Sequence, residues 1–132
     1  MNRVVARYTD GRILKGETSD FLPNKDLFHV VPSSQPGAKG PLTVKIPELK
    51  AVFFVKDLDG DPRHMERKSF DPAHPPVGRK IRVVFRDGEV LLGTTQGYQP
   101  GRPGFFMIPA DEASNIERCY VVSASAASID FV

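Results

Sequence analysis

The feature that most constrains this chain is an internal repeat. Residues 3–55 align without a gap on residues 80–132 after a shift of 77 positions. Much of the identity falls on residues that set backbone direction: Asp10/Asp87, Gly11/Gly88, Gly16/Gly93, Pro23/Pro100 and Pro32/Pro109. Glycine and proline determine turns and bends, so two copies of one fold are expected to keep them. With 132 residues in all, the repeat predicts two very small units that share a core.

Each copy begins with the pattern of a β-strand. Apolar and polar residues alternate over residues 3–8 and again over 80–86, which is the period of a strand with one apolar face. Asp10-Gly11 and Asp87-Gly88 follow, and Asp-Gly between apolar runs is typical of a tight hairpin turn. Second strands are expected over residues 12–19 and 89–96. Three further strands are expected in each copy, at residues 27–31, 42–46 and 51–55, and at 105–108, 119–123 and 128–132.

The composition also favours strands. The chain contains 12 prolines and 11 glycines, and both destabilise the interior of a long helix. We therefore predict an all-β fold of two tandem small barrels related by pseudo-twofold symmetry. Residues 1–57 form the first repeat, 58–78 the connector and 79–132 the second repeat. Asp61-Pro62 could begin a short helix in the connector, or the connector could cross as an extended arm, and the sequence leaves both open.

The hairpin regions carry a resemblance to a known pattern. Residues 8–16 with Phe21, and residues 85–93 with Tyr98, resemble the first motif of Sm-like proteins: an apolar residue, Asp-Gly, a glycine and then an aromatic. The resemblance implies that each repeat is an Sm-like or SH3-like barrel. It does not extend to an RNA pocket, because Leu22 and Gln99 stand where that site needs an acidic residue.

The whole chain also resembles a bacterial family of tandem-repeat β-barrel proteins. The segments that carry this resemblance are residues 49–57, 104–106 and 109–111. Such domains occur alone or beside signalling domains, including PilZ-like ones. The resemblance implies no particular activity.

Charge and cysteine content narrow the classes of function. The net charge is +2 from 18 basic and 16 acidic side chains, whereas proteins that neutralise nucleic acid broadly are usually strongly basic. No apolar run approaches the ~20 residues of a membrane-spanning helix, so we expect no membrane association. Cys119 is the single cysteine, which excludes an internal disulfide and suits a reducing cytoplasm.

A basic strand face is the candidate ligand site. Six cationic residues are expected on the outward faces of the first strands: Arg3, Arg7, Arg79, Lys80, Arg82 and Arg86. Arg3/Arg7 and Arg82/Arg86 have the Arg-x-x-x-Arg spacing that PilZ domains use for a cyclic dinucleotide, but the companion motif of those domains is missing. If the two stripes merged, they could bind an anionic ligand such as RNA or a cyclic dinucleotide with strong salt dependence.

No pattern of residues indicates catalysis, a metal or a cofactor. The three histidines have no metal-ligand spacing, and no serine lies in a nucleophile elbow. We therefore predict a protein that is not an enzyme: a binding or adaptor module that holds a protein partner at a sheet edge, at the groove between the repeats or on aromatic strands. The alternative is the anion-binding module described above. The oligomeric state is not predicted.

Overall fold

The computed structural model describes residues 1–33, 40–60, 69, 70, 72 and 77–132. The predicted connector helix near Asp61-Pro62 lies outside these residues. In the first half of the chain the elements are β1 (Asn2–Tyr8), β2 (Ile13–Thr18), β3 (Leu27–Pro32), β4 (Leu42–Lys45), the 3₁₀ turn η1 (Ile46–Glu48) and β5 (Leu49–Val55). In the second half they are β6 (Arg79–Phe85), β7 (Val90–Thr95), β8 (Gly104–Pro109), β9 (Ile116–Val122), η2 (Ser123–Ser125) and β10 (Ala126–Phe131).

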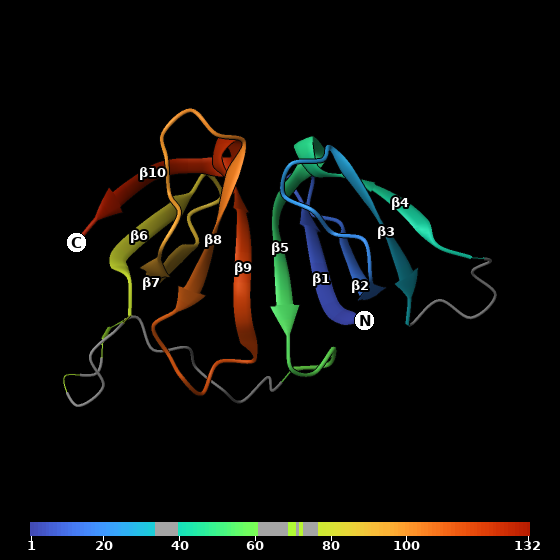
Figure 1. Cartoon of the computed structure of the whole chain (residues 1–132), viewed down its shortest axis with the longest axis horizontal. Coiled ribbons are helices and arrows are strands. Elements are labelled where there is room, and N and C mark those ends of the chain that lie inside the picture. The colour runs from blue at the N-terminus through green and yellow to red at the C-terminus, as the bar shows by residue number, and fades with distance from the viewer. Residues whose placement is uncertain (34–39, 61–68, 71, 73–76) are drawn as a thin grey trace.

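All the described strands belong to one antiparallel sheet of ten strands. Its order is β10-β6-β7-β8-β9-β5-β1-β2-β3-β4. The two halves of the chain lie side by side, with β5 and β9 adjacent in the middle of the molecule (Figure 1). The prediction of an all-β fold is confirmed.

The strand pairings of the first half recur in the second half at the same shift of 77 positions. The β1–β2 register pairs Val4 with Gly16, and the β6–β7 register pairs Ile81 with Gly93. The first and last strands of each half also pair in equivalent registers, with a register shift at the equivalent place. The hairpin turns of the two halves also have the same backbone conformation. Gly11 and Gly88 have φ of 97° and 93°, the positive φ that a tight hairpin turn requires.

The prediction of pseudo-twofold symmetry is wrong. A twofold axis would place equivalent strands against each other, β5 against β10 or β4 against β9. The sheet instead joins β5, the last strand of the first half, to β9, the fourth strand of the second half. The halves therefore follow each other head to tail, which leaves two non-equivalent edges, β4 and β10.

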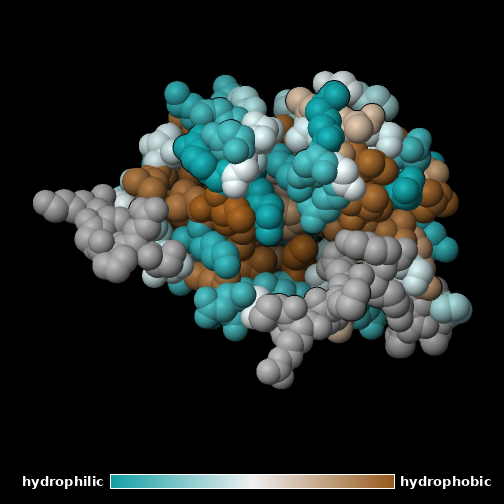
Figure 2. Space-filling model, turned by 180° about the vertical axis from the view of Figure 1, so that it is seen from behind, coloured by the Kyte–Doolittle hydropathy of each residue, from teal (hydrophilic) through white to brown (hydrophobic). Residues whose placement is uncertain are grey.

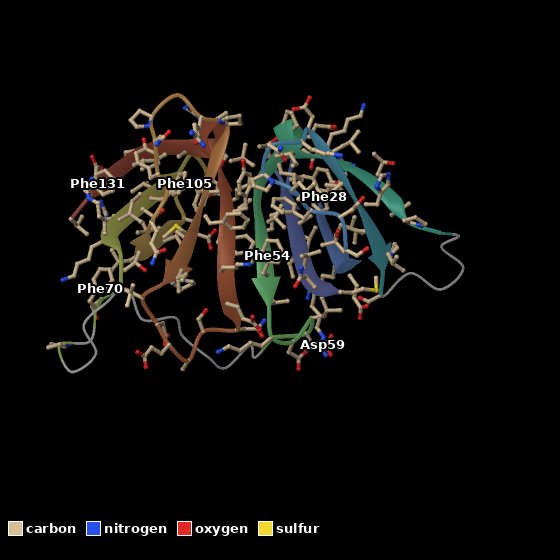
Figure 3. All side chains as sticks on the ribbon, viewed as in Figure 1. Phe28, Phe54, Asp59, Phe70, Phe105 and Phe131 are labelled. Atoms are coloured by element: carbon tan, nitrogen blue, oxygen red, sulfur yellow. The ribbon has the colours of Figure 1, made fainter. Side chains whose placement is uncertain are left out.

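The two halves share their hydrophobic cores across this junction. Alternate side chains of a strand point to opposite faces, and all of β5 and the last four residues of β9 are buried on both faces. Phe54 of β5 lies in the core of the first half, whereas Phe53 belongs to the core of the second. Tyr120 and Val122 of β9 lie in the core of the first half. Figure 3 shows Phe28 and Phe54 in one half and Phe105 in the other.

Two glycines allow the strands to bend tightly. A Cβ atom on Gly16 would overlap the carbonyl oxygen of Val31 on β3, and one on Gly93 would overlap the carbonyl oxygen of Ile108 on β8. A side chain is therefore excluded at both positions, which explains a glycine inside each second strand.

Candidate binding groove

The candidate site is a groove at the junction of the two halves. It has a volume of about 660 Å³. Equivalent segments of the two halves form its walls: residues 23–26 and 46–47 from the first half, and residues 101–104 and 122–124 from the second, with Tyr120 between them. Both 3₁₀ turns, η1 and η2, contribute to it, so it lies at the end of the molecule where both turns are drawn (Figure 1).

Two similar turns shape the rim of the groove. The amide of Lys25 donates to the carbonyl of Leu22 at 3.1 Å, and the amide of Arg102 donates to the carbonyl of Gln99 at 3.4 Å. A proline follows the first residue of each turn, where its fixed φ favours turn formation. The two turns therefore bring one long cationic side chain from each half to the same groove.

The floor of the groove is apolar and rigid. Tyr120 is 2% exposed, and its ring packs edge-on against Phe21 and Phe106 at centroid distances of 5.2 Å each. A Cβ on Gly104 would collide with the Tyr120 ring, so this glycine makes room for it. Burial raises the pKa of the Tyr120 phenol, which therefore stays neutral at physiological pH. Such a floor provides a fixed apolar surface for a bound side chain.

The charged groups of the groove are arranged unevenly. Lys25 and Arg102 occupy equivalent positions on the two walls, and Asp26 is the single acidic residue of the described lining. Among the described residues, neither cation takes part in an ion pair. The described lining contains no His, Cys or Glu, and its titratable side chains are Lys25, Asp26, Arg102 and Tyr120.

A buried lysine links the halves beside a second cavity of about 410 Å³. Lys50 on β5 is 7% exposed, and its ammonium contacts Asp87 at 2.7 Å and also Glu89. Ser125 donates to the carbonyl of Lys50 at 2.8 Å. The hydrogen bond from Lys50 holds the pKa of Asp87 below its ordinary value, assisted by the Glu89 amide. We call the set Lys50, Asp87 and Glu89 the inter-half clamp.

The structure does not gather the six predicted basic residues into one stripe. All six are exposed, but β1 and β6 are separated in the sheet by β7, β8, β9 and β5. Arg86 lines the second cavity, and the charge of Arg7 acts on the nearby Asp87. Arg3 lines a different cavity, of about 290 Å³, with Glu17 and Glu117.

The remaining basic residues have local partners. The guanidinium of Arg79 stacks on Phe131 at 3.6 Å from the ring centroid. The ammonium of Lys80 lies 5.0 Å from the ring centroid of Phe70. Arg82 lies opposite Asp130 in the β6–β10 pairing. These partners belong to β10 and to the connector.

A groove between the repeats is among the binding places expected from the sequence, but the residues that form it were not identified there. A usable signal was present, because Lys25 and Arg102 retain a positive charge at equivalent positions of the repeat. That both loops border one cavity depends on the β5–β9 pairing, which the repeat pattern does not specify.

Other kinds of site are not found in the part of the chain that the structure describes. It contains no group of three or more His, Cys, Asp or Glu side chains that could hold a metal ion. Within the same residues, no helix has the length and apolar character needed to span a membrane. In the view from behind, hydrophobic surface is concentrated across the middle of the molecule, beneath hydrophilic residues (Figure 2).

The fold and the groove thus define an all-β protein in which one continuous sheet carries two equivalent sets of pairings. The chain belongs to DUF6982, a family of unknown function, whose match covers residues 1–132. No curated protein and no solved structure matches the chain.

Proposed function

We propose that this chain is a non-catalytic module that binds a segment of a partner protein in the groove between its halves. We also propose that the halves are duplicated Sm-like barrels fused into one sheet. The recurrence of the strand pairings at the shift of 77 positions supports the duplication. In this proposal the fusion of the two halves creates the binding groove, because the groove requires a wall from each half.

The observation that supports the binding function is the apolar groove at the junction. Its size is within the range of ligand pockets, about 300–1,000 Å³. Its walls are exposed turns, including Pro23, Pro47 and Pro103, so it is open to solvent along the rim. An open groove suits a chain that enters and leaves more than it suits a small molecule, which usually becomes largely enclosed.

A selection from a phage-displayed library of random 12-residue peptides tests this proposal. Selected peptides are synthesised and titrated against the full chain, the Ala124→Trp variant and the Ala113→Trp variant. Ala124 is exposed at the edge that the groove shares with the second cavity, so a large ring there should obstruct the groove. Ala113 is also exposed, but it lies before the start of β9, whereas the groove is lined by the end of β9 and by η2. It therefore controls for the effect of a new surface tryptophan.

Binding that the Ala124→Trp variant loses and the Ala113→Trp variant keeps supports the groove. Selected peptides that bind all three proteins equally would show that the groove is not the site. A failure to select any peptide, combined with salt-sensitive binding of single-stranded RNA or cyclic di-GMP, would favour the anion-binding alternative instead.

A further inference from the structure

We propose that the segment held in the groove is extended and alternates apolar with acidic side chains. This inference rests on the proposed function and specifies the chemistry of the partner. It follows from three properties of the groove: an apolar floor, a positive rim and two equivalent walls.

The positive rim is the first step of the argument. Lys25 and Arg102 reach the groove from opposite walls, and each is exposed and in no ion pair among the described residues. Asp26 offsets only one of the two charges. Arginine can donate two parallel N–H hydrogen bonds to one carboxylate, and lysine provides a flexible point charge. A segment with carboxylates on its flanks complements this rim.

The apolar floor is the second step. Its exposed apolar surface comes from Pro23, Pro47, Pro103 and Ala124, which surround the nearly fully buried Tyr120, Ile46 and Val122. This surface suits leucine-sized side chains, because covering exposed apolar surface favours binding. A purely acidic segment would leave the floor uncovered, so the rim alone does not define the ligand.

The alternation of the segment follows from combining the floor and the rim. In an extended chain, successive side chains point to opposite sides with a rise of about 3.3 Å per residue. Every second side chain can then face the floor, while the intervening ones point toward solvent, where long cationic side chains of the rim can reach them. A helix would not alternate in this way, since its side chains repeat every 3.6 residues.

Fluorescence anisotropy with three labelled decapeptides tests the inference: alternating Glu-Leu, alternating Lys-Leu and alternating Glu-Ser. The Glu-Leu peptide is expected to bind at least tenfold more tightly than either of the others. Its affinity should fall as salt is raised from 50 to 500 mM, because exposed charges are screened. The Lys25→Glu/Arg102→Glu variant should weaken Glu-Leu binding by on the order of tenfold or more, since two weak attractions become repulsions.

The matched control is the Arg3→Glu/Arg82→Glu variant, which makes the same change of charge on β1 and β6, outside the groove. It should bind the Glu-Leu peptide as the unmodified chain does. Equal weakening in both double variants would overturn the inference, because the effect would then come from net charge alone. Circular dichroism of both variants verifies that they are folded.

The outcomes separate this inference from the proposed function. If the Glu-Leu and Lys-Leu peptides bind equally and Ala124→Trp blocks both, the groove binds peptides but the acidic preference is wrong. If none of the three decapeptides binds while library-selected peptides do, the alternating pattern is wrong and the groove function stands. If Ala124→Trp leaves Glu-Leu binding unchanged, both proposals fail.

Discussion

Phe53 tests whether the two halves are one folding unit. It lies on β5, in the first half of the chain, but its side chain is 5% exposed and belongs to the core of the second half. Its equivalent at the shift of 77 positions is Asp130, which is exposed on the edge strand β10. Replacing each residue by alanine therefore compares equivalent backbone positions in two environments.

The expected costs of the two substitutions differ strongly. Phe53→Ala removes a buried aromatic ring and leaves a cavity, which typically costs about 3–5 kcal/mol. For a chain of this length, that cost corresponds to a fall in Tm of roughly 10–20 °C. Asp130→Ala changes an exposed side chain and should alter the free energy of unfolding by no more than about 0.5 kcal/mol.

Urea denaturation measures both effects. The chain has no tryptophan, but Tyr8 and Tyr98 report on the first and second half, together with Tyr120 at the junction. Circular dichroism and tyrosine fluorescence should give one coincident transition for the unmodified chain. Two separate transitions, or a cost below about 1 kcal/mol for Phe53→Ala, would refute the shared core.

Three further predictions concern the clamp, the bent strands and the sheet edges. The pKa of Asp87 is lowered in the folded state from 3.8. Its ionised form therefore stabilises the fold fully above pH 3.8, and this stabilisation is lost as the pH falls through the lowered pKa. Asp87→Asn should thus flatten the dependence of stability on pH between 6 and 2. Gly93→Ala should cost at least about 1–3 kcal/mol in urea denaturation because its Cβ has no space, whereas Gly97→Ala, with nothing within 4 Å, should be close to neutral. The unmodified chain should not associate through its edges in sedimentation velocity, whereas the Thr43→Tyr/Asp130→Phe variant should form head-to-tail oligomers whose size rises with concentration.

Each of these predictions has a result that would contradict it. Unchanged pH dependence in Asp87→Asn would mean that the clamp does not contribute to stability. Equal costs at the two glycines would mean that the strands tolerate a side chain at the bend. Concentration-dependent assembly of the unmodified chain would show that its edges are open.

Features of this fold that are specified by a few neighbouring residues could be predicted from the sequence, whereas features that depend on distant segments could not. The Asp10-Gly11 turn and the bend at Gly16 are specified within a few residues, and the structure places a positive φ and a close strand approach there. The order of the halves is not local, since β5 can pair with either edge of the second half without changing its own pattern. The predicted basic face failed to gather for the same reason, because four strands come to lie between β1 and β6.

The residues at the junction explain why the sheet continues once and then stops. The core side chains around the β5–β9 pairing are apolar, including Val5 of β1 and Phe53 of β5 on one side and Phe106 of β8 with Tyr120 and Val122 of β9 on the other. The buried Lys50 lies just before the paired residues of β5. A second chain docking in the same way would bring together the equivalent positions of β6 and β10 and of β3 and β4, where the side chains are polar: Arg82, Asp130, His29, Thr43 and Lys45. Burying a charge without a partner costs several kcal/mol, and inward-pointing charges are a common means of preventing edge-to-edge pairing. β4 is also only four residues long, so a second chain would form few backbone hydrogen bonds with it to offset the cost of burying these charges. The apolar surface that joins the halves is thus confined to a single junction, and with it the groove that needs one wall from each half.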